Sequence, residues 1–388
     1  MILIFETHPV QYRAPLYREV SKLMGAGNIK VIYGSDFSIR AYKDVQFGGD
    51  VDWGIDLLSG YDCVCLSNLN GGKLEGFWSL RGWGIGGIFE REDVSAIVLT
   101  SLSHAFDFRA YYEAKKRGIP VLIRTETQDI AFKRSYMKSC LRSLIYKLIY
   151  AGIRKGLPIG QLNAMHYRKH DLDCSQSCFV HYNVPNPYTG MIAADKITRR
   201  SAFRKRYGIP DDIWVVGFAG KLIDKKNPLL LLESLRYAVE TYSLNVGVII
   251  IGTGELSEAL VAYVKQFDLP VWFTGFLDQN AIMDGYLAMD CLMLPSKQMG
   301  ETWGLVVNEG LQAGCSIIVS EYVGSSYEFR EWERVRVIAS GDYRSGGEMI
   351  RELIEYPHDW SWCSDLMKPY TLTEVAKSFA ECLENHQC

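Results

Sequence analysis

The order of apolar and polar positions divides most of the chain into short strand-like runs separated by segments of helical spacing. Continuous apolar runs of about four to eight residues indicate buried strands, and apolar residues three or four positions apart indicate a helix. In the first half, the runs predict strands within residues 2–5, 29–34, 61–66, 95–102, 119–127 and 178–183. In the second half, they predict strands within residues 213–220, 245–252, 271–276, 290–295 and 315–320. Helical spacing lies between most of these runs, as at Leu16, Val20 and Leu23.

A Pro- and Asn-rich break at residues 184–188 separates the two alternating patterns. Such clusters between periodic segments mark loops and linkers. Strands that alternate with helices on both sides of a break predict two α/β domains, each built on a doubly wound, Rossmann-like parallel sheet, that face each other across a cleft. We place the N-terminal domain at residues 1–187 and the C-terminal domain at residues 188–371.

The composition is that of an ordinary globular protein. The 388 residues are 48% hydrophobic and 22% charged, and the formal net charge is -3. This length is typical of about two domains, and the net charge gives no indication of a nucleic-acid partner. The N-terminus lacks the features of a signal peptide, and no stretch reaches the roughly 18 apolar residues of a membrane span.

Ten cysteines are scattered along the chain, several of them inside apolar runs. A reduced thiol packs there as a small hydrophobic group, so we expect a reducing, cytoplasmic environment. Two of the cysteines lie near three histidines, but no second cysteine pair completes a zinc site, so no metal is expected. The residues are Cys174, Cys178, His166, His170 and His181.

Residues 295–314 (PSKQMGETWGLVVNEGLQAG) combine a polar loop with a helical segment behind a predicted strand. Backbone N–H groups at the start of such a helix suit an anion such as a diphosphate. Glu301 precedes these groups and Glu309 follows about two turns later, so two carboxylates can accept hydrogen bonds from hydroxyl pairs at the two ends of one elongated ligand. The alternative is a capping acid and a solvated glutamate on a helix surface. The N–H groups belong to Thr302, Trp303, Gly304 and Leu305.

Two lysines follow another predicted strand. Gly220 and Lys221 end the strand, and Lys226 lies five residues further along. A flexible ammonium group is a good point-charge partner for phosphate. The two lysines and the helix N–H groups therefore predict a diphosphate pocket that needs no metal. A dinucleotide-binding fingerprint at residues 252–257 fails, because Ser257 stands in place of the third glycine.

Polar side chains also follow strands of the first half. Ligands of open parallel sheets bind at the carboxyl ends of strands, so topology places these side chains at the cleft. His104 follows the predicted strand at residues 95–102, where a histidine serves either as a structural hydrogen-bonding group or as part of a site. The residues directly after the first strand are His8, Gln11, Tyr12 and Arg13.

Residues 133–169 contain nine lysines and arginines and no acidic residue. A basic amphipathic helix can lie on anionic lipid, so residues 133–155 predict a peripheral contact with the inner face of the cell membrane. The alternative is a surface helix that packs its apolar face on the sheet and keeps its basic side in water. The apolar residues that recur on one helical face are Met137, Leu141, Leu144, Ile145 and Leu148.

Four segments of the second half resemble, in order and spacing, the nucleotide-binding domain of family 4 retaining glycosyltransferases, which have the two-domain GT-B architecture. The E-x7-E spacing within that order is a fairly specific signature. The segments are residues 220–235 (GKLIDKKNPLLLLESL), 249–256 (IIIGTGEL), 273–296 (FTGFLDQNAIMDGYLAMDCLMLPS) and 301–320 (ETWGLVVNEGLQAGCSIIVS).

The first half resembles a bacterial surface-polysaccharide subgroup of the same family, of the kind that acts in lipopolysaccharide biosynthesis. The segments that carry this likeness are residues 7–19 (THPVQYRAPLYRE), 120–127 (PVLIRTET) and 158–170 (PIGQLNAMHYRKH). The likeness is weakest over about residues 35–90, where acceptor specificity would be set.

The resemblance implies roles for the residues of the second half. Glu301 would contact the hydroxyl groups of the donor sugar, and Glu309 would contact the ribose diol of the nucleotide. Lys226 and Lys221 would hold the diphosphate beside Gly220 and the helix N–H groups, and would help the leaving group depart. The family more often has arginine at position 221, so lysine keeps the charge there but loses the bidentate fork.

The resemblance also assigns residues of the first half. His104 falls near the active-site histidine of the N-terminal domain, and Arg124 and Glu126 join the side of the cleft that faces the acceptor. The last helix, at about residues 372–388, would pack back on the N-terminal domain.

The implied activity is retaining, metal-independent transfer of a sugar from a nucleoside-diphosphate sugar, of UDP or GDP type, to a glycan or lipid-linked saccharide acceptor. The departing phosphate assists deprotonation of the acceptor hydroxyl in this chemistry, so no separate nucleophile or cofactor is needed. Two alternatives stay open: a sugar-nucleotide epimerase or hydrolase of the same architecture, and a non-catalytic nucleotide-sugar-binding subunit.

Overall fold

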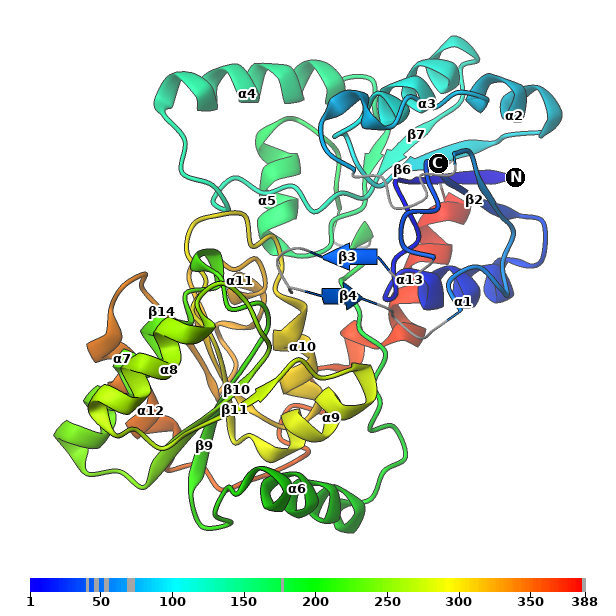
Figure 1. Cartoon of the computed structure of the whole chain (residues 1–388). Helices are drawn as coiled ribbons and strands as arrows, with labels where there is room; N and C mark the ends of the chain where they lie inside the picture. Colours follow the sequence, from blue (N-terminus) through cyan, green and yellow to red (C-terminus); the bar gives the residue numbers. More distant parts are fainter. Residues whose placement is uncertain (40–41, 45–48, 52–55, 68–73, 176–177, 386–388) are drawn as a thin grey trace.

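The computed structural model describes residues 1–39, 42–44, 49–51, 56–67, 74–175 and 178–385 (Figure 1). Two six-stranded sheets form two lobes, and a small antiparallel pair, β3 (Tyr42–Asp44) and β4 (Gly49–Val51), lies on the side of the N-terminal lobe that faces the other lobe. Each large sheet has helices on both faces. The predicted α/β class, with two doubly wound parallel sheets, is confirmed.

The N-terminal sheet has the strand order β5-β2-β1-β6-β7-β8, and every neighbouring pair is parallel. Its strands are β1 (Ile2–Glu6), β2 (Ile29–Tyr33), β5 (Cys63–Cys65), β6 (Ala96–Leu99), β7 (Val121–Ile123) and β8 (Lys155–Gly156). Because successive strand residues point to opposite faces, the sheet buries side chains on both sides. One face is covered by α1 (Ala14–Met24) and α13 (Leu372–Glu384). The other is covered by α2 (Ile85–Arg91), α3 (Ala105–Lys116) and α5 (Gln161–Lys169).

The last helix returns to the N-terminal lobe. Val375, Phe379 and Leu383 of α13 are buried in the same cluster as Ile2 and Ile4 of β1, and Figure 1 shows α13 beside α1. The end of the predicted helix, residues 386–388, lies outside the described residues. The division into domains at 187/188 and 371/372 stays a prediction.

The C-terminal sheet has the order β11-β10-β9-β12-β13-β14 and is also parallel throughout. Its strands are β9 (Trp214–Ala219), β10 (Val246–Ile251), β11 (Val271–Gly275), β12 (Cys291–Leu294), β13 (Ser316–Ser320) and β14 (Val335–Ile338). One face carries α7 (Pro228–Tyr242), α8 (Ser257–Phe267) and α12 (Tyr343–Leu353). The other carries α6 (Ala193–Tyr207), α9 (Gln279–Ala288) and α10 (Leu305–Gln312).

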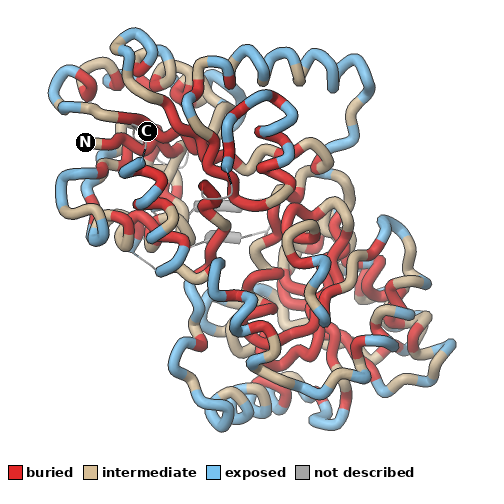
Figure 2. Tube along the Cα trace, turned by 180° about the vertical axis from the view of Figure 1, so that it is seen from behind, coloured by how far each residue is buried: buried red, intermediate tan, exposed pale blue. Residues whose placement is uncertain are grey.

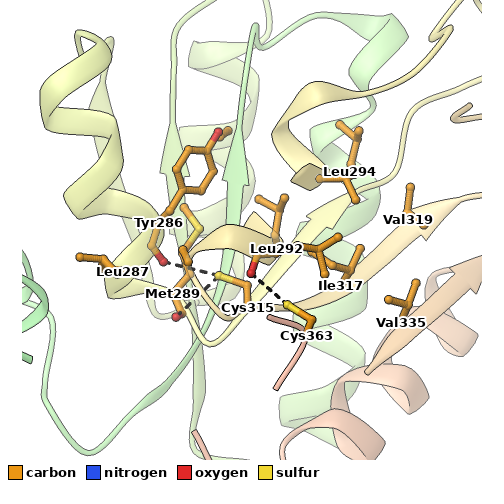
Figure 3. Packing of buried hydrophobic residues seen from close by; sticks show 14 of the residues in the cluster. Tyr286, Leu287, Met289, Leu292, Leu294, Cys315, Ile317, Val319, Val335 and Cys363 are labelled. Atoms are coloured by element: carbon orange, nitrogen blue, oxygen red, sulfur yellow. Dashed lines mark hydrogen bonds between the residues drawn. The ribbon is translucent and has the colours of Figure 1, made fainter. Parts of the chain in front are cut away.

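Reduced cysteines fill part of the core between this sheet and α9 and α10. The Cys315 thiol donates to the carbonyl oxygen of Tyr286 at 3.5 Å, and the Cys363 thiol donates to that of Leu311 at 3.1 Å (Figure 3). Both cysteines are free and buried. They pack as small hydrophobic groups, as the sequence predicts.

The predicted strand at residues 178–183 is wrong. The segment runs extended beside residues 158–159, with the amide of Val180 donating to the Pro158 carbonyl at 2.9 Å, but it forms no strand. Its own carbonyl groups are taken by a side chain, because the Arg124 guanidinium donates to the oxygens of Val180 and His181. These bonds replace the ladder that a further strand would need.

Both large sheets change the direction of winding at their centre. The order in each is the doubly wound one, and the switch lies between β1 and β6 in the first sheet and between β9 and β12 in the second. Ligands of such sheets bind outside the carboxyl ends of the strands at this point. The two switch points carry His8 and His104 on one side, and Lys226 and Glu301 on the other.

Among the described residues, no helix has the length and apolar character needed to cross a lipid bilayer. Figure 2 shows that most outer helix faces are exposed and that the buried chain is concentrated in the two sheets.

We expect Phe379→Ala to lower the free energy of unfolding by about 3–5 kcal/mol, because it opens a cavity between α13 and the N-terminal sheet. Phe379 is 1% exposed, whereas Leu23, on α1, is 51% exposed. Leu23→Ala is therefore the matched control and should change stability by less than about 1 kcal/mol. Chemical denaturation followed by circular dichroism measures both, and equal effects would contradict the packing described for α13.

Candidate functional site

Glu301 and Lys226 meet at the switch point of the C-terminal sheet. The Lys226 Nζ lies 2.8 Å from the Glu301 Oε2, and the Lys225 Nζ lies 3.8 Å from the same oxygen. Glu301 is only 9% exposed. Two ammonium groups around one shielded carboxylate leave the site with surplus positive charge, so an incoming anion can share or replace Glu301 as the partner of Lys226.

The start of α10 presents backbone N–H groups to the same space. Gly304 precedes the helix with φ 86°, and a Cβ atom there would lie 2.7 Å from side-chain atoms of both Leu294 and Val323. Only glycine fits this left-handed, crowded position. Among the described residues, no acceptor pairs with the N–H groups of residues 302–305. The helix start is therefore available for an anion.

Gly220 and Lys221 lie where β9 ends, on the loop that leads to Lys226. The Gly220 amide donates to the carbonyl oxygen of Ile251 at 3.0 Å, which fixes this loop against the end of β10. Thus Lys221 and Lys226 lie on one loop after β9, and the Lys226 ammonium meets Glu301, which lies on the loop between β12 and α10.

Glu309 lies further along α10 and lines a small pocket between α9, α10 and residues 184–188. The Tyr286 hydroxyl donates to its Oε2 at 2.5 Å. Burial raises the pKa of Glu309 to about 6, although this hydrogen bond opposes the shift. At pH 7 the carboxylate is mainly charged and can accept further hydrogen bonds. The other residues that line the pocket are Val184, Pro185, Pro187, Tyr188, Gln279, Ile282, Met283 and Gln312.

Two histidines occupy the switch point of the N-terminal sheet. His8 follows β1, and its Nδ1 lies 2.9 Å from the Thr7 hydroxyl oxygen. His104 precedes α3, where its backbone amide donates to Asp107. Burial lowers the pKa of His8 to about 4 and lowers the pKa of His104. Both side chains are thus mainly neutral at pH 7.

A chain of polar contacts crosses from this lobe to the other. Arg13 donates to Glu6 at 2.6 Å and to Glu126 at 2.7 Å, and the Thr302 hydroxyl donates to Glu126 at 2.9 Å. Burial alone would raise the pKa of Glu126, but Arg13 and the hydroxyls of Tyr182 and Thr302 hold it below its ordinary value. Glu126 thus ties the N-terminal lobe to the residue that follows Glu301.

The remaining residues predicted on the acceptor side differ in their surroundings. Arg124 is 3% exposed and holds the 180–181 carbonyl groups, so it stabilises the backbone. The Tyr12 ring packs against Tyr182 at 5.6 Å between centroids. Gln11 is half-buried in the turn before α1. Trp303, predicted for its N–H group, also buries its ring between Tyr182 and Phe329.

Aromatic side chains of residues 77–83 contact the first turns of α3, after His104, and were not predicted from the sequence. Phe77 packs on Phe108, one turn after His104 on α3, with 5.6 Å between ring centroids. Trp78 and Trp83 are 69% and 67% exposed. Large exposed aromatic groups beside a site mark contact surfaces. The signal in the sequence is an aromatic, glycine-rich run, GFWSLRGWG, inside the region of weakest family likeness.

One group of side chains in the described part of the chain has the spacing of metal ligands: Asp129, His166 and His170. Its donor atoms are already engaged, because His166 Nδ1 lies 3.0 Å from Asp129 and its Nε2 lies 3.1 Å from the Tyr150 hydroxyl. Lys169 also contacts Asp129, at 2.9 Å. A metal cation on Asp129 would be repelled by the ammonium group of Lys169. The three side chains are therefore better described as a structural hydrogen-bonded cluster.

A family model matches part of the second half of the chain. The model of the family described as glycosyl transferases group 1 matches residues 199–361. An uncharacterized glycosyltransferase of Methanocaldococcus jannaschii is 27% identical over 124 residues, which is 31% of each chain. The chain thus spans about a third of the length of this curated relative.

Solved structures match over the whole chain. HepE of Anabaena, in complex with UDP, superposes with a TM-score of 0.68 at 13% identity and covers 99% of both chains. WaaG, a glycosyltransferase involved in lipopolysaccharide biosynthesis, superposes with a TM-score of 0.60 at 13% identity and covers 99% of this chain and 100% of its own. At such identities the likeness shows the fold, which is the two-lobed GT-B architecture.

We expect the stability of the wild type to fall relative to Glu309→Gln as the pH rises from about 4.5 to 6.5. The folded pKa is about 6 and the ordinary value is 4.5, so the folded protein binds this proton more tightly than the unfolded chain does. The stabilisation is present below pH 4.5 and is lost through pH 6, an effect of about 2 kcal/mol. Denaturant titration at several pH values measures it, and parallel pH profiles for the two proteins would contradict the burial of Glu309.

Proposed function

We propose that this protein transfers a sugar from a nucleoside-diphosphate sugar, of UDP or GDP type, to a glycan or lipid-linked saccharide, with retention at the anomeric carbon and without a metal. The observation that carries the proposal is the 2.8 Å pair of Lys226 with Glu301, directly before the open N–H groups of α10. The match of residues 199–361 to a glycosyltransferase family supports it.

The donor would lie along the carboxyl edge of the C-terminal sheet. The diphosphate binds Lys226 and Lys221 and the N–H groups of residues 302–305, with Gly220 leaving room for it. The ribose diol donates to Glu309, and the nucleoside extends toward the pocket between α9 and α10. Glu301 then faces the hydroxyl groups of the sugar. The lysines and the helix start supply the positive charge that a metal supplies in other sites, so the activity is expected to survive EDTA.

Transfer breaks the bond between the anomeric carbon and the phosphate oxygen and forms a bond from the acceptor oxygen on the same face. The acceptor proton passes to the departing phosphate oxygen. Negative charge grows on the diphosphate as that bond breaks, so preorganised cations and N–H groups stabilise the transition state more than the ground state. His104, neutral and across the cleft, would orient the acceptor or the sugar.

The acceptor would occupy the N-terminal side, along His8, Gln11 and Tyr12 and the exposed tryptophans after β5. Arg13, predicted there from topology, and Arg124 and Glu126, predicted there from family likeness, would shape this wall mainly by holding one another and the backbone. With a lipid-linked acceptor, the transfer reaction takes place at the inner face of the cell membrane. Residues 133–155 then form a peripheral contact with that membrane.

We expect Glu301→Gln and Lys226→Met each to lower the turnover number by about 10²–10³-fold, the loss typical of one preorganised electrostatic contact. Lys226→Met should also weaken nucleotide binding, whereas Glu301→Gln should retain it. Lys265→Met, on an exposed turn of α8, is the matched control. Release of labelled sugar from the donor, and transfer to membrane glycolipid or glycan extract, are the measurements.

The same assay separates the alternatives. Product that forms at full rate with no added acceptor would indicate an epimerase or hydrolase, and donor binding with no turnover would indicate a binding subunit. Wild-type turnover by either site variant would overturn the assignment of Glu301 and Lys226.

We expect Trp78→Ala to raise the KM for the acceptor about ten-fold or more, because a stacked aromatic contact of one to a few kcal/mol is lost. The KM for the donor should not change, since the donor lies on the other lobe. Steady-state kinetics with each substrate varied in turn measure both values. A change confined to the donor KM would contradict the location of the acceptor.

A further inference from the structure

The helix α4 (Tyr136–Tyr150) turns its apolar side to solvent. Of its fifteen residues only Tyr150 is buried, and Figures 1 and 2 show the helix along the outer edge of the N-terminal lobe. The predicted alternative, an apolar face packed on the sheet, is therefore wrong. The exposed apolar residues and their exposed fractions are Tyr136 84%, Met137 82%, Leu141 61%, Leu144 56%, Ile145 46% and Leu148 69%.

The charge around this stripe is positive. No acidic residue lies between residues 133 and 169. In the described structure Lys133 and Lys138, near the start of the helix, have no ion-pair partner. Lys147, near its end, pairs with Asp171. A second copy of the chain would bring like charges together across the stripe. An anionic bilayer accepts the apolar side chains and attracts the cations, so it is the occupant that fits.

The segment that leads into α4 contacts the loop that carries Glu301. The Gly300 amide donates to the carbonyl oxygen of Ala131 at 2.8 Å, and the Gln298 side chain donates to that of Ile130 at 2.9 Å. Phe132 forms a β-bridge with Met299. We call residues 128–134 the clamp segment. It holds the loop between β12 and α10 from the opposite lobe.

The contact between Phe132 and Gly300 requires a glycine at position 300. Gly300 has φ 95°, and a Cβ atom there would lie 2.3 Å from the Phe132 ring, so the ring packs against bare backbone. On its other side Gly300 is held by the C-terminal lobe, because the Lys225 Nζ donates to its carbonyl oxygen at 2.9 Å. The residue before Glu301 is thus fixed from both lobes.

The clamp segment is in turn fixed to α4. Arg142 of α4 forms an ion pair with Asp129 and donates to the Gln128 carbonyl oxygen at 3.4 Å. Arg134 donates to the Asp129 carbonyl oxygen at 3.2 Å and lies over the Phe132 ring at 5.2 Å. Contacts therefore run without a gap from the exposed helix to Gly300.

We propose that the exposed face of α4 docks on an anionic bilayer and that this docking, through the clamp segment, sets the position of the loop that carries Glu301. The docking surface itself is independent of the chemistry at the site, while its effect on donor binding rests on the proposed function. The consequence is a donor site that gains affinity at the membrane, where a lipid-linked acceptor is found.

The first test is vesicle binding. The wild type should co-sediment with vesicles of phosphatidylglycerol and phosphatidylcholine in low salt, and less with phosphatidylcholine alone or in high salt, because salt screens the cations. Leu141→Glu/Leu148→Glu should lose most of this binding. Leu23→Glu, at an exposed apolar position on α1, should bind as the wild type does. Equal binding by all three proteins would overturn the docking surface.

The second test is the effect of the vesicles on UDP and GDP affinity, followed by competition with a fluorescent nucleotide. For the wild type the affinity should rise about five-fold or more, the usual lower range for coupled sites. The double variant should show no rise. Gln298→Ala, which removes a clamp contact far from the bilayer, should bind vesicles as the wild type does but show a reduced rise.

The outcomes are distinguishable. An undiminished rise in Gln298→Ala, or no rise in a wild type that binds vesicles and nucleotide, would overturn the coupling. A protein that binds vesicles through α4 but binds neither nucleotide would support the docking surface while contradicting the proposed function.

Discussion

The whole site depends on one loop that both lobes hold. Gly300, Glu301 and Thr302 lie between β12 and α10, and each end of this tripeptide is bonded to the N-terminal lobe, through Ala131 and through Glu126. Each such hydrogen bond contributes only about 1 kcal/mol. Together they fix the position of the Glu301 carboxylate, and in the proposed reaction a misplacement of about 1 Å can cost a hundred-fold in rate. A change in the relative position of the lobes would therefore also change the geometry of the site.

The charges of Lys226 and Glu301 explain why this loop must be held in place. Lys226 is held at 2.8 Å by Glu301 before any ligand arrives, so the cation does not have to be reorganised when an anion binds. The neutral histidines of the N-terminal lobe add no competing charge, because burial lowers their pKa values. The charge of Arg13 on the same lobe is balanced by Glu6 and Glu126, whereas Lys225 and Lys226 share the single carboxylate of Glu301.

The sequence was sufficient for the parts set by local pattern. Apolar runs predicted ten of the twelve strands in the two large sheets but missed β8 and β14. The position of Glu301, Glu309, Lys221 and Lys226 relative to strand ends placed them at one edge of one sheet. The sequence pattern failed to predict the structure where side chains take the hydrogen bonds of the backbone. Residues 178–183 have the composition of a strand, but Arg124 takes their carbonyl groups.

The contacts between lobes could not be predicted, because they join residues far apart in the chain. Glu126 to Thr302 spans 176 positions, and nothing in either segment indicates the other. The exposed stripe of α4 was visible as a helical face, but whether it packs on the sheet or faces solvent depends on where the helix lies. The aromatic group after β5 was overlooked because it lies in the region of weakest family likeness.

Calorimetric titration of UDP and GDP into the purified protein in the presence of EDTA tests whether the lysines and the start of α10 form a diphosphate site. We expect one of the two nucleotides to bind at a single site and Lys226→Met to weaken that binding. Binding of neither nucleotide, or binding that appears only after a divalent metal is added, would contradict a diphosphate site made from lysines and the start of α10.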